Sequence, residues 1–227
     1  MKLALTTSTP CFEVALLEDE RPLATLGIEG QKRHAEHMFA GIDDVFREAG
    51  VTKADVTGVI CDIGPGSFTG VRVGLAAAKG IAFGLQVPIW GVTSLRVMAN
   101  DALRRNSRLE VVAAVIDARR GERFVAAYRR DGEVALAPRT VPNEDLVAAL
   151  GGHGTPCGDR PDGYPGPWLE GPCRPRAAAM GPVTTGRPPS PLDALAPLYL
   201  RDADATPPAV APDRRVEAMK RRFGPLD

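Results

Sequence analysis

The 227 residues are enough for one large domain or two small lobes. Hydrophobic residues make up 44% of the chain and charged residues 25%, which is typical of a folded protein with a sizeable core. Twenty-eight basic residues balance 28 acidic ones, so the chain lacks the basic excess that autonomous nucleic-acid-binding proteins use to neutralise phosphates. If the protein works on nucleic acid, we expect a partner to supply most of the positive charge.

The four cysteines form no C-x-x-C pair, which argues against a zinc ribbon and a thioredoxin motif. Cys11 and Cys61 lie in or beside apolar segments and are interpreted as small core residues. The first ten residues contain no signal-peptide apolar region, and no segment approaches the roughly 20 apolar residues of a membrane span. We therefore expect a cytoplasmic protein with reduced thiols and no membrane contact.

Two short apolar runs, residues 3–5 and 13–17, flank a polar Thr/Ser turn and predict two strands, and residues 23–28 predict a third. An amphipathic helix follows, because apolar side chains recur at the i, i+3, i+4 and i+7 spacing until Gly50 ends it. Two interpretations stay open: the stripe faces the protein's own core, or part of it is exposed for a partner. The stripe consists of Ala35, Met38, Phe39, Ile42, Val45, Phe46 and Ala49.

Strands and helices then alternate, which indicates an α/β layered architecture. Thr93 or Ser94 is the expected cap of the last helix of this half. The expected order is a strand at 56–63, a glycine-rich loop at 64–70, a helix at 71–83, a strand at 87–92 and a helix at 95–103.

The second half begins again with strands. Asn143 is the expected cap of a short helix over residues 144–150, and residues 151–191 are so rich in Gly and Pro that irregular backbone is expected. A further element is expected at 194–200, before a Pro/Ala spacer and a basic segment at 214–223. The strands of this half are expected at 111–118, 123–128 and 134–137.

The most distinctive string is GPGSFTGVRVG, residues 64–74, between a strand and a helix. It is not a phosphate-binding Walker A loop, because Val71 rather than lysine follows Gly70. It is not a dinucleotide fingerprint either, because the third glycine comes one residue late. The plainer interpretation is a sharp turn capped by Ser67 or Thr69, with small residues on the following helix that let another helix approach closely.

This loop, continued as GPGSFTGVRVGLAAAKG, closely resembles the signature of the bacterial TsaB (YeaZ-type) family. Other segments agree in the same order: LALTTST at residues 3–9, KRHAEH at 32–37, IDARRGERFVAAY at 116–128 and PLYLR at 197–201. The resemblance runs from residue 1 to about 201 and weakens between 150 and 190.

The resemblance implies an α/β fold of the actin-like (ASKHA) type, with two βββαβαβα-type halves of which the second is reduced. The expected domains are an N-terminal lobe at 1–104, a reduced C-terminal lobe at 105–201, and a Pro/Ala linker with a basic tail at 202–227. The tail has two open interpretations: a solvated, partly disordered extension, or a segment that contacts tRNA phosphates or an acidic partner.

The resemblance also implies a function. Family members are non-catalytic subunits that bind and activate TsaD, which transfers threonylcarbamoyl to the adenosine beside the anticodon in tRNAs reading ANN codons. TsaE is the ATPase partner, so ATP and metal are expected on partner subunits and no cofactor on this chain alone. Contact with tRNA is expected only through the complex, and a homodimer is expected when TsaD is absent.

The family's pairing surface is formed by its first two helices, which implies a set of interface residues here. They are His34, Ala35, Met38, Phe39, Ile42, Phe46, Gly66, Phe68, Gly70, Arg72, Val73, Gly74, Ala77 and Ala78.

Residues Thr6, Thr7 and Ser8 are interpreted as a vestigial phosphate loop, because actin-like kinases place an aspartate at the position of Thr6. A neutral hydroxyl does not replace a carboxylate as a Mg²⁺ ligand. We therefore expect no catalytic and no metal-binding residue in this chain. The alternative is a free-standing ATP-dependent kinase or ATPase of the same fold.

Two further enzyme hypotheses have weaker support. His34 and His37 are three residues apart, whereas the catalytic paralogue has an H-x-x-x-H metal pair, so two polar residues at a helix start are preferred. The glycoprotease label that the family also carries has no residue constellation behind it, since no G-x-S-x-G elbow occurs. Asp117, Arg119 and Glu122 are interpreted as a structural or interface network rather than a catalytic pair.

Overall fold

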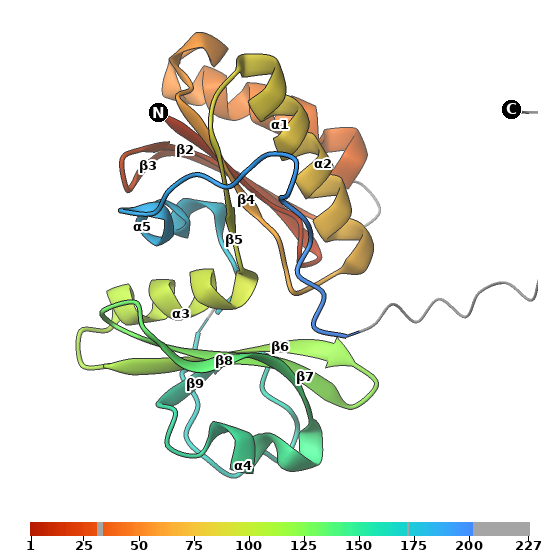
Figure 1. Cartoon of the computed structure of the whole chain (residues 1–227), viewed down its shortest axis with the longest axis vertical. Coiled ribbons are helices and arrows are strands. Elements are labelled where there is room, and N and C mark those ends of the chain that lie inside the picture. Colours follow the sequence, from red (N-terminus) through yellow and green to blue (C-terminus); the bar gives the residue numbers. More distant parts are fainter. Residues whose placement is uncertain (31–33, 172, 202–227) are drawn as a thin grey trace, which may run out of the picture.

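The structure is a computed structural model that describes residues 1–30, 34–171 and 173–201. Figure 1 shows two lobes, each built around one sheet, with α3 (Ser94–Arg105) between them. The expected linker and basic tail at 202–227 lie outside the described residues. The fold is the α/β, actin-like two-lobe fold with a reduced second lobe that the sequence predicted.

The first lobe is a five-stranded sheet in the order β3-β2-β1-β4-β5. The first three strands are antiparallel neighbours, and β4 and β5 extend the sheet in parallel. All five strands were predicted, with bounds that differ by a few residues. They are β1 (Lys2–Thr6), β2 (Cys11–Glu18), β3 (Arg21–Glu29), β4 (Gly58–Asp62) and β5 (Ile89–Val92).

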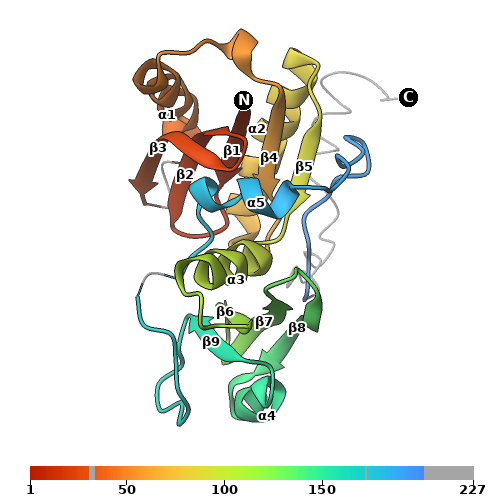
Figure 2. The ribbon, with the colours of Figure 1, turned by 90° about the vertical axis from the view of Figure 1, so that its left-hand side faces the viewer.

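Two helices, α1 (His34–Ala49) and α2 (Phe68–Leu85), cover one face of this sheet, and Figure 2 shows them behind the strands. The apolar stripe of α1 mostly faces the core, with Met38, Ile42, Val45 and Phe46 buried. The stripe of α2 does the same through Val71, Leu75, Ala78 and Ala82. Both helices therefore form because their apolar spacing matches one buried face.

By length and composition alone, α2 is long and apolar enough to span a membrane. In this structure its buried stripe, 33% of the helix, packs against the first sheet.

The helix caps partly match the predictions. Ser67, one of two candidates, caps α2, since its side-chain oxygen accepts from Gly70 N at 3.2 Å. Thr93 caps α3 in the same way through Arg96 N. The prediction for Asn143 was wrong: it is the first residue of the 3₁₀ turn η3 (Asn143–Asp145) and makes no capping bond, because β8 runs directly into that turn.

The second lobe is a four-stranded sheet in the order β8-β7-β6-β9. One of its faces packs on α3 and the other on α4 (Leu146–Leu150). The short parallel strand β9 was not predicted, because its Gly and Pro residues hide the strand pattern. The bounds are β6 (Val111–Arg119), β7 (Glu122–Arg129), β8 (Val134–Pro142) and β9 (Thr155–Gly158).

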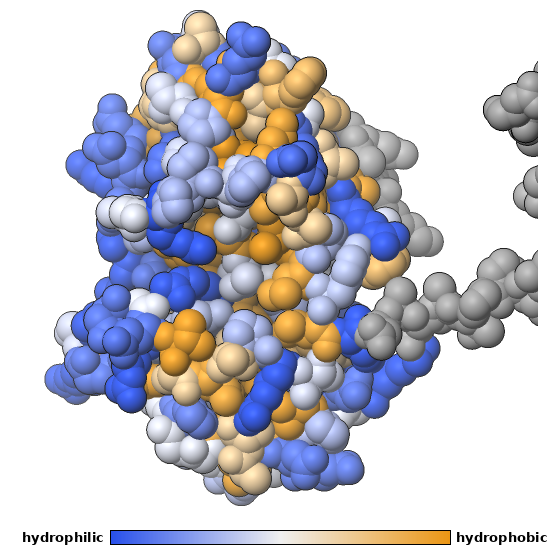
Figure 3. Space-filling model, in the orientation of Figure 1, coloured by the Kyte–Doolittle hydropathy of each residue, from blue (hydrophilic) through white to orange (hydrophobic). Residues whose placement is uncertain are grey.

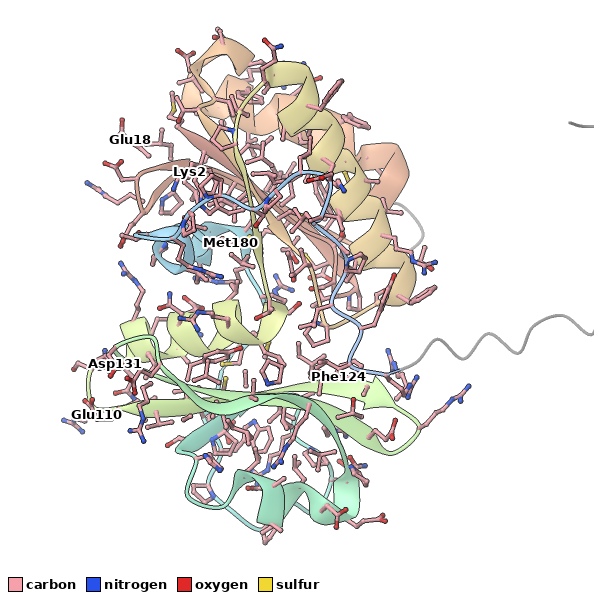
Figure 4. All side chains as sticks on the ribbon, viewed as in Figure 1. Lys2, Glu18, Glu110, Phe124, Asp131 and Met180 are labelled. Atoms are coloured by element: carbon pink, nitrogen blue, oxygen red, sulfur yellow. The ribbon has the colours of Figure 1, made fainter. Side chains whose placement is uncertain are left out.

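The chain returns from the second sheet to the first lobe after β9, which differs from the expected lobe boundary at 201. Short helices η4 (Ala177–Ala179) and α5 (Gly181–Thr184) pack on the face of the first sheet opposite α1 and α2 (Figure 2). Figure 4 places Met180 in this layer, between the sheet and α3.

The expected element at 194–200 is neither a helix nor a strand; it is an irregular segment that runs along both lobes. Leu198 N donates to Ile63 O of the first lobe at 2.8 Å, and Thr140 of β8 donates to Leu200 O at 2.9 Å. Pro191 and Pro197 are compatible with this shape, since proline interrupts regular hydrogen-bonding patterns.

Candidate interaction surface and interlobe cleft

The turn after β1 surrounds a buried carboxylate. Thr6 and Ser8 donate their hydroxyl hydrogens to Asp62 Oδ2 at 2.8 and 2.5 Å. Ser94 Oγ and Gly64 N donate to Asp62 Oδ1 at 2.7 and 2.8 Å. We call this group the Asp62 cluster; it joins the ends of β1 and β4 to the start of α3.

Sequence reasoning missed Asp62. An acid does stand beside Thr6, but it comes from β4 rather than from the first turn. The sequence feature that could have revealed Asp62 was its position at the end of a buried strand. The carboxyl ends of parallel strands meet at one edge of a sheet, so such a residue lies near the turn after β1.

The acceptor sites of the Asp62 carboxylate are used by hydrogen bonds within the protein itself. An ionised carboxylate has about four lone-pair sites, and the four donors of the Asp62 cluster occupy that number. Asp62 is 1% exposed. Burial raises the pKa of Asp62, while the hydrogen bonds from Ser8, Ser94, Gly64 and Thr6 act in the opposite direction. The arrangement suits a structural carboxyl group and leaves little lone-pair capacity for a metal ion.

The glycines of the distinctive loop make room for this same turn. A methyl group built on Gly66 would stand 2.3 Å from Ser8 O, and one on Gly70 would stand 2.0 Å from Thr7 O. At Gly74 it would stand 2.1 Å from Thr7 Oγ1. The expectation that another helix approaches closely at Gly70 and Gly74 was therefore wrong, because the protein's own turn fills that space; Thr7 also donates to Gly70 O at 2.7 Å.

Several other predicted interface residues are also covered by the first lobe itself. Met38 is 1% exposed and Ala78 is fully buried, so neither side chain is available to a partner. Ile42 and Phe46 are buried too, although both line a surface hollow. The reason is that one apolar stripe on each helix is needed to cover the sheet. The side chains of His34 and Ala35 lie outside the described residues.

The outward side of α2 is exposed and combines predicted interface residues, such as Phe68, with residues that were not predicted, such as Phe83. Phe68 is 43% exposed and Phe83 75%, and Phe39 of the neighbouring α1 is 59% exposed. Apart from adjacent residues and the backbone of α2 itself, no atom of the described residues lies within 4 Å of a methyl group built at Gly80 or Gly84. We call this surface the α2 face; it comprises Phe39, Phe68, Thr69, Arg72, Val73, Ala76, Ala77, Gly80, Phe83 and Gly84.

A hollow of about 240 Å³ opens between α1 and α2. Phe39, Ile81 and Gly84 are among the residues that line it, and Asp43 and Lys53 form an ion pair of 3.0 Å among its lining residues. Figure 3 shows apolar side chains at the surface over these two helices. The hollow and the α2 face together form a surface with an apolar centre and charged residues beside it.

One end of the α2 face is held by an aromatic–arginine stack. The Arg72 guanidinium lies 3.7 Å from the centre of the Phe68 ring, and its Nε donates to the Tyr199 hydroxyl at 2.7 Å. The two rings are 5.4 Å apart. The stack therefore connects the first turn of α2 to Tyr199, which lies in the irregular segment at the end of the described residues.

A larger cleft of about 580 Å³ lies between the lobes, next to this stack. Its walls come from the turn after β1, the start of α2, the β6–β7 hairpin and residues 198–201. Phe124 of β7 lines it at the junction of the lobes (Figure 4).

Three charged residues of the cleft wall, Asp117, Arg119 and Arg201, form ion pairs. Asp117 forms ion pairs with Arg123 and Arg119, and Glu122 pairs with Arg201 at 2.8 Å. Asp159 Oδ2 also accepts from Asp117 N at 2.8 Å. These contacts agree with the interpretation of the Asp117, Arg119 and Glu122 group as a structural network.

Among the residues that the structure describes, no group of three or more His, Cys, Asp or Glu side chains is placed to hold a metal ion. The fold and its cleft define an actin-like α/β protein of two lobes.

Comparisons with known proteins identify the branch of this class. A family model described as TsaD, tRNA N6-adenosine threonylcarbamoyltransferase, matches residues 28–152, more than half of the chain. The solved structure of YeaZ from Pseudomonas aeruginosa superimposes with a TM-score of 0.71 at 30% identity, over 88% of this chain and 99% of that one. The chain belongs to the bacterial TsaB (YeaZ-type) family.

Proteins with similar sequences support the same family membership. The tRNA threonylcarbamoyladenosine biosynthesis protein TsaB of Escherichia coli is 38% identical over 129 residues, which are 57% of this chain and 55% of that protein. An uncharacterized Mycobacterium tuberculosis protein is 32% identical over 214 residues, 92% of this chain and 95% of that one. The matched part thus spans about half the length of the E. coli relative.

Proposed function

We propose that this chain is a non-catalytic subunit in tRNA threonylcarbamoyladenosine biosynthesis, and that it binds and activates TsaD. The observation that carries the proposal is the α2 face, an exposed and largely apolar helix surface with two open glycines. Solvent-exposed phenylalanines beside a hollow are typical of the centre of a protein–protein interface.

The surface suits a helix of the partner. Ala76, Gly80 and Gly84 carry almost no side chain, so a partner helix can approach the backbone of α2 closely. Phe39 and Phe83 stand beside this strip and supply the apolar area that an interface centre buries. The same surface explains the homodimer that we propose for the chain without TsaD, because a self-complementary helix face pairs about a two-fold axis.

In this proposal the other subunits, TsaD and TsaE, carry out the catalytic steps. The donors of the Asp62 cluster use the lone pairs of the carboxylate nearest to the vestigial phosphate loop, Thr6, Thr7 and Ser8. ATP and metal accordingly belong to TsaD and TsaE in this proposal, and tRNA meets the chain only through the complex. Such an assembly would work in the cytoplasm.

The interlobe cleft is the observation that keeps an ATP-dependent enzyme as the alternative, since its volume of about 580 Å³ is large enough for a small molecule. Equilibrium binding and turnover of ATP by the purified chain separate the two hypotheses. Turnover by the chain alone would support the enzyme and count against the subunit.

Phe83→Asp and Gly80→Trp are each expected to weaken binding to TsaD at least tenfold, because a central aromatic residue contributes about 2 kcal/mol and a bulky side chain blocks close approach. Both changes lie on open surface, so the free energy of unfolding should stay within about 0.5 kcal/mol of the unchanged chain. Binding is measured by titration of purified TsaD.

Val147→Asp is the matched control, because Val147 is 48% exposed but lies on α4 of the second lobe. Its affinity for TsaD should be unchanged. The surface assignment fails if both α2 variants bind TsaD as tightly as this control. Separately, equal tRNA modification by TsaD and TsaE with and without this chain would refute the activating role.

A further inference from the structure

Two cysteines that are distant in sequence meet beneath α3. Cys157 lies in β9 and is fully buried. Cys173 lies on the irregular stretch that follows β9, is partly exposed, and packs against the same apolar cluster as Cys157. The two thiols are close enough in this cluster for each to shift the pKa of the other. The fold therefore brings a solvent-reachable thiol into contact with a protected one.

An arginine stands beside the exposed thiol. Arg105 Nη2 of α3 lies 4.0 Å from Cys173 Sγ, and the same nitrogen pairs with Asp101 at 3.1 Å. Asp101 also pairs with Arg176 at 3.3 Å. A fixed guanidinium at this distance favours the thiolate form of Cys173, and the thiolate is the reactive form.

The pKa of Cys173 is lowered and that of Cys157 is raised, so Cys173 is the more acidic of the two thiols. The neighbouring Cys157 lowers the pKa of Cys173, and Arg105 acts in the same direction. The neighbouring Cys173 and burial both raise the pKa of Cys157. Burial raises the pKa of Cys11 and Cys61 as well, so these two are expected to be unreactive thiols.

We propose that Cys157 and Cys173 form a reversible disulfide site that responds to hydrogen peroxide, with Cys173 as the attacking thiol and Cys157 as the resolving one. This site is independent of the α2 face and of the proposed function. The arrangement of a low-pKa exposed cysteine next to a second cysteine is the one that redox-sensitive sites use.

The chemistry takes two balanced steps. The Cys173 thiolate attacks one peroxide oxygen, the O–O bond breaks, and the departing hydroxide takes a proton to become water, which leaves Cys173 as a sulfenic acid. The Cys157 thiol then attacks the Cys173 sulfur, the S–O bond breaks, and the hydroxyl leaves as water with the Cys157 proton. Peroxide is reduced and the two thiols are oxidised to one disulfide; a thiol reductant reverses the change.

The bond would tie the returning chain to the second sheet. Arg176 comes three residues after Cys173, and η4 and α5, which pack on the first sheet, follow directly. A disulfide closes the loop between residues 157 and 173 and restricts the unfolded chain. We expect a rise in melting temperature on the order of 5 °C on oxidation.

Mass spectrometry of the full chain tests the site. The protein is treated with hydrogen peroxide, alkylated with N-ethylmaleimide after denaturation, and digested with trypsin. Both cysteines fall in one tryptic peptide, residues 140–176, because prolines follow Arg160 and Arg174. We expect this peptide to lack two hydrogens and to carry no label, and to take two labels after reduction, while Cys11 and Cys61 are labelled throughout.

Two labels on peptide 140–176 after peroxide, or a sulfinic acid on Cys173 with Cys157 still free, would overturn the proposal. Arg105→Gln should slow disulfide formation at pH 7 about 3-fold to 10-fold, because the thiolate fraction of Cys173 falls. The control is Arg104→Gln, since Arg104 pairs with Glu20 at 3.0 Å instead. Equal rates for both arginine variants would exclude the role of Arg105.

Discussion

Gly70→Ala is expected to lower the free energy of unfolding by about 3 kcal/mol, which is the upper end of the cost of overpacking a filled site. The new methyl group would stand 2.0 Å from the backbone oxygen of Thr7. That oxygen belongs to the turn that holds Thr6 and Ser8 on Asp62, so neither partner moves without breaking hydrogen bonds. Urea unfolding of the purified chain measures the loss.

Gly80→Ala is the matched control on the same helix. Apart from adjacent residues and the backbone of α2 itself, no described atom lies within 4 Å of the added methyl group, so the substitution should stabilise the chain by about 0.5–1 kcal/mol through helix propensity alone. Opposite signs for the same substitution ten residues apart on α2 would establish that Gly70 serves a close contact. Equal effects of the two substitutions would refute it.

Asp62→Ala is expected to cost about 4 kcal/mol, more than most single substitutions do. It leaves three buried hydroxyls and the Gly64 N–H without their acceptor, and each unsatisfied buried donor costs about 1–3 kcal/mol. Asp62→Asn should cost less than half as much, because its amide oxygen still accepts from Gly64 N and Ser94 Oγ. A similar loss in both variants would mean that the charge, rather than the hydrogen bonds, stabilises the cluster.

The stability difference between the unchanged chain and Asp62→Asn should depend on pH. The folded pKa of Asp62 is raised above the ordinary aspartate value of about 3.9, so the folded state binds this proton more tightly than the unfolded state does. The contribution is fully present below about pH 4 and declines as the pH rises through the folded pKa. Urea unfolding at a series of pH values measures it; a difference that grows with pH would contradict this direction.

The α2 face shows how far a helical pattern can predict an interface. The periodicity of α1 and α2 correctly located both helices, and it left open which apolar residues face the core. Met38 and Ala78 are buried, whereas Phe39 and Phe83 are exposed on the same helices. The side of a helix that covers a sheet depends on where the sheet lies, and a one-dimensional pattern does not contain that position.

The sequence by itself determined the class of the protein. Strand and helix spacing predicted the alternating elements of both lobes, and the string at residues 64–80 with its companion segments indicated the family. These features are local: turn residues, caps and apolar periodicity act within a few residues along the chain.

The tertiary structure alone decided the contacts between distant residues. Asp62 meets Thr6 from 56 positions away, the Thr7 turn fills the space at Gly70 and Gly74, and Cys173 reaches Cys157 only after the chain has looped out of the second sheet. Such contacts depend on how β1, β4, α2 and α3 are placed against one another. That placement is set by packing across the whole core, so no segment of sequence taken alone reports it.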